Sequence, residues 1–167
     1  MTDAEPRFHA DLDAMARRVI DGNHYLTLAT IDPDGEARVS PVYYTAGRYS
    51  DFYWVSSPEA HHSHNVSERP TVKIVIFDST AVVGAGEAVY LTATARAVRD
   101  DELESVIAEA FRTTAGARPF EPDELRGSAD LRLYVAAITA CEVHVAGRHP
   151  EHGSGVDIRL PAEPAGA

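Results

Sequence analysis

Hydrophobic positions follow two different periods along the chain. Between residues 7 and 21 apolar residues recur every three or four positions, as they do on one face of a helix. After Gly22, short segments rich in β-branched and aromatic residues alternate between apolar and polar positions, which is typical of half-buried strands. The apolar stripe of the leading helix needs a surface to cover. The pattern therefore predicts one helix that packs on a sheet.

Turn-forming residues divide the β-rich part into strands. The segment DPDG at residues 32–35 predicts a tight turn, and Pro41 favours an edge position or a bulge in the strand that follows. The predicted strands cover residues 25–31, 36–45, 52–56, 71–78, 89–98, two segments of 131–147 that break near 136–139, and 156–160. The first three form a predicted meander.

Two further helices are predicted between the strands. The segment Ser57-Pro58-Glu59 combines a serine cap with proline at the first helical position, and Pro70 marks the end of that helix. Residues 102–114 place apolar side chains on one helical face. A loop with one possible helical turn is predicted for residues 116–130, and a disordered tail after residue 160.

These elements predict a mainly β protein with flanking helices. Six or more mostly adjacent strands with few helices indicate a closed or half-closed antiparallel barrel. The chain shows no internal repeat, so one domain is expected. Within it, residues 1–24 are a helix that packs on the barrel, residues 25–147 the barrel with its inserted helices, and residues 148–167 a C-terminal loop, short strand and tail.

Composition and charge narrow the possible partners. The formal net charge is −11, which disfavours binding to a nucleic-acid backbone, although a locally positive pocket can still hold a small anion. No apolar run approaches the roughly 20 residues of a membrane span, and the N-terminus lacks an apolar secretory core, so a cytoplasmic protein is expected. The single cysteine, Cys141, lies in an apolar run and is interpreted as a small buried hydrophobe.

The segment SSPEAHHSHNVSERP, residues 56–70, carries the most distinctive chemistry. On a helix His61 and His64 share a face while His62 points about 100° away, so a three-ligand metal site is geometrically poor and none is predicted. A helix N-terminus with nearby hydroxyl groups can instead hold a phosphate, with Arg38 as a fixed cation. The negative charge of Glu59 would repel a phosphate placed there, and a solvated helix with surface histidines remains equally compatible with the local chemistry.

The order of segments gives a further indication. A leading helix is followed by YLTLAT, DPDGEARVSPVYY, FYWVSSPEAHHSHNV, RPTVKIVIFD and VYLTATARAV. This succession, over about residues 11–98, resembles the pyridoxamine 5′-phosphate oxidase-like family of flavin-binding split barrels. The resemblance implies a six-stranded split barrel that forms a homodimer, with FMN bound at the subunit interface.

The resemblance also implies which residues contact the cofactor. Arg38 matches the family's phosphate-binding arginine, and Val39 and Ser40 would lie along the isoalloxazine. Tyr43 stands where the true oxidases have a lysine. The end of the third strand would touch flavin and phosphate, and the following two histidines replace an arginine and a lysine of the true oxidases. These last positions are Trp54, Ser56, Ser57, His61 and His62.

The resulting hypothesis is an FMN-binding oxidoreductase that transfers hydride between the flavin N5 and an unknown small molecule. Vitamin B6 oxidation itself is not expected, because the C-terminal segment VDIRLPAEPAGA offers only Arg159 to hold a pyridoxal product. One alternative is a deazaflavin-dependent reductase on the same fold. Another is a non-catalytic protein that binds flavin or haem, with His24, His61 or His62 as the haem ligand. No catalytic residue is identified, although Tyr43, Tyr44 and Trp54 could line the substrate face.

Overall fold

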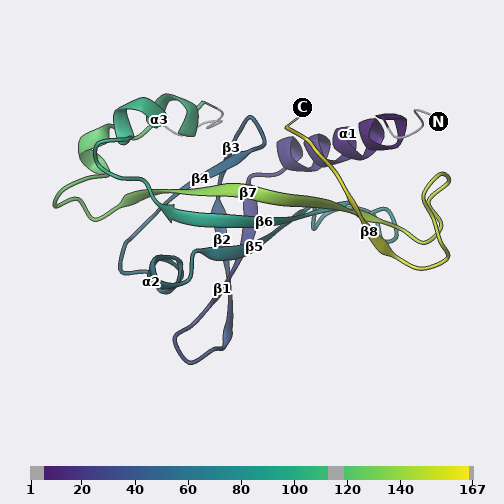
Figure 1. The fold of residues 1–167 in the computed structure, drawn as a ribbon, viewed down its shortest axis with the longest axis horizontal. Helices are drawn as coiled ribbons and strands as arrows, with labels where there is room; N and C mark the ends of the chain where they lie inside the picture. Colours follow the sequence, from purple (N-terminus) through teal and green to yellow (C-terminus); the bar gives the residue numbers. More distant parts are fainter. Residues whose placement is uncertain (1–5, 113–118, 166–167) are drawn as a thin grey trace.

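The computed structural model describes residues 6–112 and 119–165, with side chains from residue 10 onward. Figure 1 shows three α-helices and one short 3₁₀ helix around a curled sheet. The elements are α1 (Pro6–Gly22), β1 (Tyr25–Ile31), β2 (Ala37–Tyr43), β3 (Thr45–Gly47), β4 (Asp51–Ser56), α2 (His61–Glu68), β5 (Thr71–Phe77), β6 (Ala88–Ala97), α3 (Leu103–Ala110), η1 (Pro122–Glu124), β7 (Arg132–Val145) and β8 (Ile158–Pro161). No described helix combines the length and the apolarity needed to cross a membrane.

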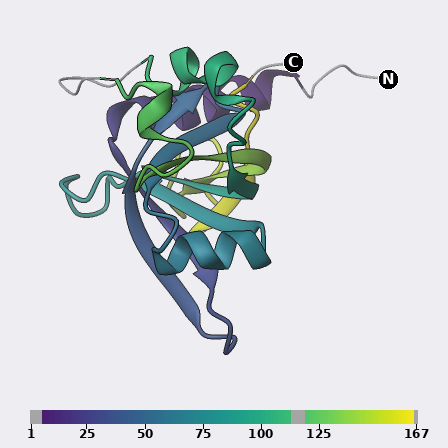
Figure 2. The same cartoon turned by 90° about the vertical axis from the view of Figure 1, so that its left-hand side faces the viewer.

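The described strands form one antiparallel sheet in the order β2-β1-β5-β6-β7-β4-β3, with β8 paired to β7. Only Tyr44 separates β2 at one end of this order from β3 at the other. The chain therefore bends at Tyr44 and brings the two ends of the sheet together as a half-barrel (Figures 1 and 2). This is the mainly β split-barrel architecture that was predicted, with eight strands, two of them short, instead of six.

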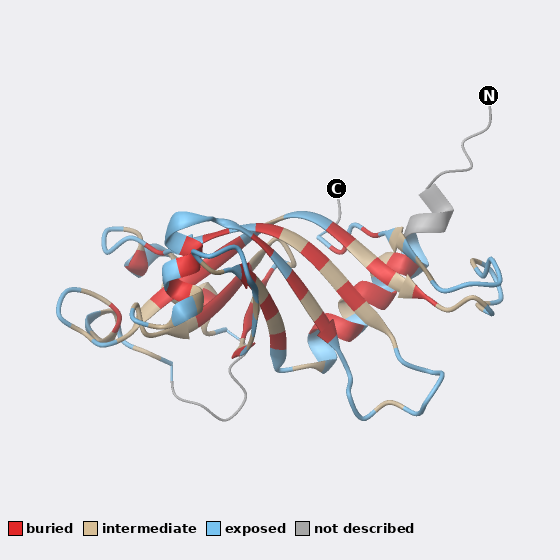
Figure 3. Cartoon of the chain, turned by 90° about the horizontal axis from the view of Figure 1, so that it is seen from below, coloured by how far each residue is buried: buried red, intermediate tan, exposed pale blue. Residues whose placement is uncertain are grey.

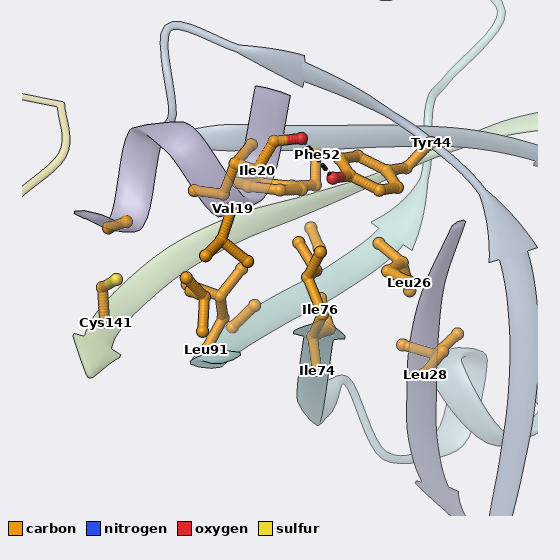
Figure 4. Packing of buried hydrophobic residues seen from close by; sticks show 14 of the residues in the cluster. Val19, Ile20, Leu26, Leu28, Tyr44, Phe52, Ile74, Ile76, Leu91 and Cys141 are labelled. Carbon is orange, nitrogen blue, oxygen red and sulfur yellow. Dashed lines mark hydrogen bonds between the residues drawn. The ribbon is translucent and has the colours of Figure 1, made fainter. Parts of the chain in front are cut away.

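The barrel core forms because strands such as β1, β5 and β6 alternate buried positions with more exposed ones. In β1, Leu26 and Leu28 are 1% and 0% exposed, and Thr27 between them is partly exposed; Figure 3 shows the same alternation as coloured bands along the strands. Helix α1 covers the core with Val19 and Ile20, and the Tyr44 hydroxyl donates a hydrogen bond to the Ile20 carbonyl at 2.6 Å (Figure 4). Full burial of such an aliphatic side chain stabilises the fold by about 1.5–3 kcal/mol.

A second, smaller core lies on the other side of β4. Phe52 and Trp54 face the barrel core, whereas Tyr53 packs with Leu103 of α3 and Leu125 beside η1. The consecutive apolar residues of β4 are thus explained, because this strand is covered on both faces.

Two strand predictions are corrected by the sheet. Residues 132–145 form one strand, β7, and the expected break is a bulge at Thr139, because Thr92 pairs with Ala140 while Ala93 pairs with Ile138. The first three predicted strands do not form a simple meander, since the second is divided at Tyr44 and its continuation, β3, pairs with β4.

The second helix begins later than its sequence signals predicted. Residues 57–60 form a turn, and α2 starts at His61 with Ala60 as its N-cap and no side-chain cap. The Ser57 hydroxyl accepts a hydrogen bond from the Glu59 amide at 3.2 Å, and the Ser57 carbonyl accepts one from the Ser63 hydroxyl at 2.8 Å. Ser57 thus stabilises the turn before the helix instead of capping the helix itself. The predicted end of helix α2 before Pro70 is confirmed.

The structure also differs from the predictions at α3 and at the C-terminal segment. Helix α3 is shorter than predicted, and residues 113–114 of that prediction lie outside the described residues. The expected disordered tail is ordered to residue 165. The Glu163 amide donates to Asp13 Oδ1 at 2.5 Å and Arg17 donates to the Pro164 carbonyl at 2.6 Å, so this segment lies along α1 (Figure 1).

Candidate functional site

Four of the predicted phosphate-binding residues come from three different elements and meet at one end of the barrel. Arg38 lies near the start of β2, Ser56 ends β4, and His61 and His62 form the first turn of α2. His62 Nε2 lies 2.9 Å from the Ser56 hydroxyl, and Arg38 is close enough for its charge to lower the His62 pKa. The fold thus assembles one cluster, named here the Arg38 cluster and defined as Arg38, Ser56, His61 and His62.

The carboxylate of Asp32 is hydrogen-bonded to the guanidinium of Arg38 in this cluster. Arg38 Nε donates to the two Asp32 carboxylate oxygens at 2.8 and 3.0 Å, and Nη2 donates to Oδ2 at 2.6 Å. The side-chain amide of Asn65, a residue of α2, donates to Asp32 Oδ1 at 2.6 Å and to the Thr30 hydroxyl at 3.0 Å. The hydrogen bonds from Arg38 and then Asn65 lower the pKa of Asp32 to about 2, so the carboxylate is charged at neutral pH.

Sequence reasoning missed both Asp32 and Asn65. Asp32 was interpreted only as part of a turn, although the hairpin register could have placed it near Arg38, because Arg38 pairs with Thr30. Asn65 is 3% exposed, and its role depends on the docking of α2 beside β1, which no local pattern indicates.

His62 is a neutral hydrogen-bonding group in this environment. Burial lowers its pKa, and the charges of Arg38 and His61 lower it further. An imidazole with a pKa below its ordinary value of about 6.5 is unprotonated at neutral pH. His62 therefore presents a ring nitrogen to Ser56 and to any ligand, and it adds little positive charge at neutral pH or above.

The remaining predicted residues are not members of the cluster. Along β2 the side chains alternate between faces, so Arg38 and Ser40 share the face of the buried Val42, whereas Val39 and Tyr43 point to the opposite face. Val39 is 67% exposed. Ser57 stays next to the cluster, but its hydroxyl is used in the turn before α2.

Tyr43 and Trp54 have different surroundings. The Tyr43 ring stacks on His24 with centroids 6.2 Å apart and meets the Tyr25 ring edge-on at 5.7 Å. Trp54 is 2% exposed and stacks on Tyr134 at 5.4 Å. Its indole nitrogen has no hydrogen-bond partner among the described residues. Trp54 thus belongs to the barrel core, and it also borders an apolar cavity of about 270 Å³ beneath α3.

Strand β2 connects the cluster to two cavities. In the described part of the chain β2 pairs only with β1 and forms an edge of the sheet, so its other edge presents backbone N–H and C=O groups. Tyr43, five residues and about 17 Å from Arg38, borders a cavity of about 390 Å³ shared with His24, Arg48 and Tyr49. It also borders an apolar cavity of about 270 Å³ beneath α3.

This geometry suits an elongated ligand with one anionic end. The cluster offers a guanidinium, a hydroxyl and imidazole nitrogens at one end of β2, and the edge of the strand offers backbone donors along its length. At the other end, beside Tyr43, one cavity offers both polar and aromatic groups, and the second has mostly aromatic and apolar walls. A planar ring joined to a phosphate would match these three parts in order.

Comparison with known proteins gives the following results. The family model described as pyridoxamine 5′-phosphate oxidase matches residues 12–144, and no curated protein sequence matches. A heme binding protein from Mycobacterium smegmatis shares 21% identity over 92% of this chain with a TM-score of 0.67, and this chain spans 59% of its length. HutZ, the heme storage protein of Vibrio cholerae, shares 25% identity over 84% of this chain and 99% of its own, with a TM-score of 0.65. A protein described as an F420 reductase shares 16% identity over 70% of this chain and 87% of its own, with a TM-score of 0.50.

Proposed function

This chain belongs to the pyridoxamine 5′-phosphate oxidase family, and on that premise we propose that it binds FMN and transfers hydride between the flavin and a small molecule. The observation that carries the proposal is the convergence of Arg38, Ser56, His61 and His62 at one end of β2. Family membership allows both flavin enzymes and non-catalytic binding proteins, so the choice of an FMN-binding enzyme rests on these four residues.

The phosphate end of FMN would lie in this cluster. Arg38 supplies the guanidinium, which can bind two phosphate oxygens at once. Ser56 and the neutral His62 supply hydrogen bonds. Because Arg38 is already bound by Asp32, the phosphate would share or displace that carboxylate. The chain thus fits the group but holds it with less net positive charge than an arginine and a lysine would supply.

The flavin ring would lie along the free edge of β2 towards Tyr43. Backbone groups near Val39 and Ser40 would hydrogen-bond its polar edge, and Tyr43 would stand beside the ring. Bound FMN supplies a hydride acceptor or donor at its N5. The cavity that Tyr43 shares with His24, Arg48 and Tyr49 offers space and polar groups for a small-molecule substrate.

A homodimer is the second part of this proposal. The outer face of β1, β2 and β5 exposes Tyr25 (62%), Val39 (67%) and Phe77 (48%). Large side chains exposed together on one sheet face favour a partner surface, and a free strand edge beside them favours it further. A second copy placed there would cover this face and close the flavin site from the other side.

FMN and riboflavin titrations of Arg38→Ala test the function. We expect wild-type protein to quench or shift flavin fluorescence on binding FMN, and Arg38→Ala to weaken FMN binding about tenfold or more, the effect of a lost charge-assisted bond. Riboflavin, which lacks the phosphate, should bind both proteins equally. Arg99→Ala, a change at an exposed arginine paired with Glu102, is the matched control. Absence of any fluorescence change with saturating FMN would reject the proposal.

Haem binding is the alternative that the comparison supports most directly, because the heme storage protein of Vibrio cholerae aligns over 84% of this chain. A neutral imidazole is the form that binds iron, and His62 is neutral at pH 7 while His24 is exposed beside Tyr43. A Soret band on haem addition that is lost in His24→Ala, His61→Ala or His62→Ala would favour this function.

A deazaflavin is the remaining alternative cofactor, since F420 is a deazaflavin and one similar structure is described as an F420 reductase. The acidic chain disfavours this larger anionic ligand. Parallel titration with FMN and F420 separates the two: tighter binding of F420 would replace FMN in the proposal.

A further inference from the structure

Three potential metal ligands meet where the C-terminal loop lies against α1, on the other side of the molecule from α2 and the Arg38 cluster (Figure 1). His152 Nε2 lies 3.0 Å from Asp11 Oδ2. One ligand atom from each of Asp11, Glu151 and His152 lies within 4.8 Å of the other two. The His152 side chain is 6% exposed, whereas that of Asp11 is 46% exposed. The imidazole of His152 is therefore nearly buried and contacts the exposed Asp11 carboxylate, and the exposed Glu151 carboxylate lies close by.

The loop holds His152 in place before any ion binds. His149 Nδ1 accepts hydrogen bonds from the amides of Glu151 at 3.3 Å and His152 at 3.1 Å, and the His149 and His152 rings stack with centroids 5.0 Å apart. The Gly153 amide donates to the His149 carbonyl at 2.9 Å. A Cβ at Gly153 would lie 2.5 Å from that carbonyl oxygen, so the tight loop requires glycine there.

We propose that Asp11, Glu151 and His152 form a binding site for one divalent transition-metal ion of the Zn²⁺ class. The ligand set of one imidazole and two carboxylates, with solvent in the remaining position, suits zinc better than Mg²⁺ or Ca²⁺, which prefer oxygen ligands alone. Metal–ligand distances of about 2.0–2.2 Å require donor atoms about 3–4 Å apart. The Asp11–His152 pair already meets this requirement, and the exposed Glu151 side chain can rotate to meet it.

Ion binding replaces a proton and joins two distant segments. A carboxylate only accepts hydrogen bonds, so in the absence of metal the proton between Asp11 and His152 is carried by Nε2. When a metal ion binds Nε2, this proton moves to Nδ1 of His152 or leaves to solvent, and the ion links α1 to a loop 141 residues later in the chain. Because the unfolded chain does not hold these ligands together, binding stabilises the folded state in proportion to ion concentration.

The test is a titration of EDTA-treated, full-length protein with ZnCl₂, followed by calorimetry and by thermal unfolding. We expect one bound equivalent and a rise of the unfolding temperature with zinc concentration. Glu151→Gln, which leaves the Asp11–His152 contact intact, and His152→Ala should each weaken zinc binding at least about tenfold. His64→Ala is the matched control, because His64 forms an exposed pair with Glu59 at 3.8 Å, and it should leave the affinity unchanged.

Two results would overturn the proposal. The first is the absence of zinc binding by the wild-type protein, which would leave the Asp11–His152 contact as a simple hydrogen bond between α1 and the loop. The second is binding that persists in Glu151→Gln and His152→Ala but is lost when His61, His62 and His64 are replaced together, which would place the ion on α2.

Discussion

Asp32 binds the Arg38 guanidinium through hydrogen bonds of 2.6, 2.8 and 3.0 Å at the end of β2. The same guanidinium is the one proposed to hold the phosphate of FMN. The pairing orients Arg38, and Asn65 in turn orients Asp32. It also places a negative charge, retained down to a pKa of about 2, beside the site of an anionic ligand. The strength of the proposed FMN binding would therefore depend on the competition between one carboxylate and one phosphate.

Asp32→Asn should strengthen FMN binding several-fold at low ionic strength. The substitution removes the competing charge, while the asparagine oxygen can still accept the hydrogen bond from Asn65. The measurement is the FMN dissociation constant from flavin fluorescence, with Asp78→Asn as a control at an exposed carboxylate bonded to Thr80. Weaker binding by Asp32→Asn would mean that Asp32 serves mainly to position Arg38.

The lowered pKa of His62 should appear as a pH dependence of stability. Because burial disfavours the protonated imidazole, the unfolded chain takes up the proton first as pH falls. The stabilising contribution of neutral His62 is present above the ordinary pKa of about 6.5 and is lost as pH falls through the lower folded-state value.

We therefore expect the unfolding temperature of wild-type protein to fall more between pH 7.5 and pH 5.5 than that of His62→Gln. The control is His64→Gln, whose side chain is 59% exposed in the wild type and which should follow the wild-type profile. Parallel profiles of the wild type and His62→Gln would contradict the assignment of His62 as a half-buried neutral imidazole.

Arg48→Asn should stabilise the turn between β3 and β4. Arg48 and Tyr49 have φ values of 48° and 61°, the left-handed region that asparagine tolerates better than arginine. The Arg48 side chain is 81% exposed, and its 3.6 Å ion pair with Glu109 contributes little. A gain of about 0.5–1 kcal/mol in the free energy of unfolding is expected.

Chemical denaturation measures that gain. Arg48→Ala is the control, because it loses the same ion pair without gaining asparagine's tolerance of positive φ. If both variants had the same stability, backbone strain at residue 48 would not be a significant cost.

Val39→Asp should dissociate the proposed homodimer. Val39 is 67% exposed on the outer face of β2, and a charge buried there between two subunits would lack a partner. The molecular mass in solution, measured by light scattering, should change from dimer to monomer. Val83→Asp, at a position 100% exposed outside the sheet, should leave the mass unchanged. A wild-type protein that is already monomeric would refute the dimer.

The sequence by itself determined the elements whose signals are local. The helical stripe of α1, the alternation of β1, β5 and β6, and Pro70 after α2 all follow from spacing within a few residues, and the structure places them where they were predicted. Periodicity reports which face of an element is buried, and that is sufficient to indicate a mainly β barrel. The resemblance of the segment order to a known family then indicated where Arg38, Ser56, His61 and His62 would lie.

Only the tertiary structure decided how those residues are paired. The contacts of Asp32 with Arg38, of Asn65 with Asp32 and of His152 with Asp11 join positions 6, 33 and 141 residues apart. The late start of α2 and the bend at Tyr44 likewise depend on hydrogen bonds to neighbouring segments. The physical reason is that a polar side chain binds the groups that folding brings close to it. A hairpin register can place near neighbours such as Asp32 and Arg38 together, but spacing along the sequence does not give the distance from α2 to Asp32 or from the C-terminal loop to α1.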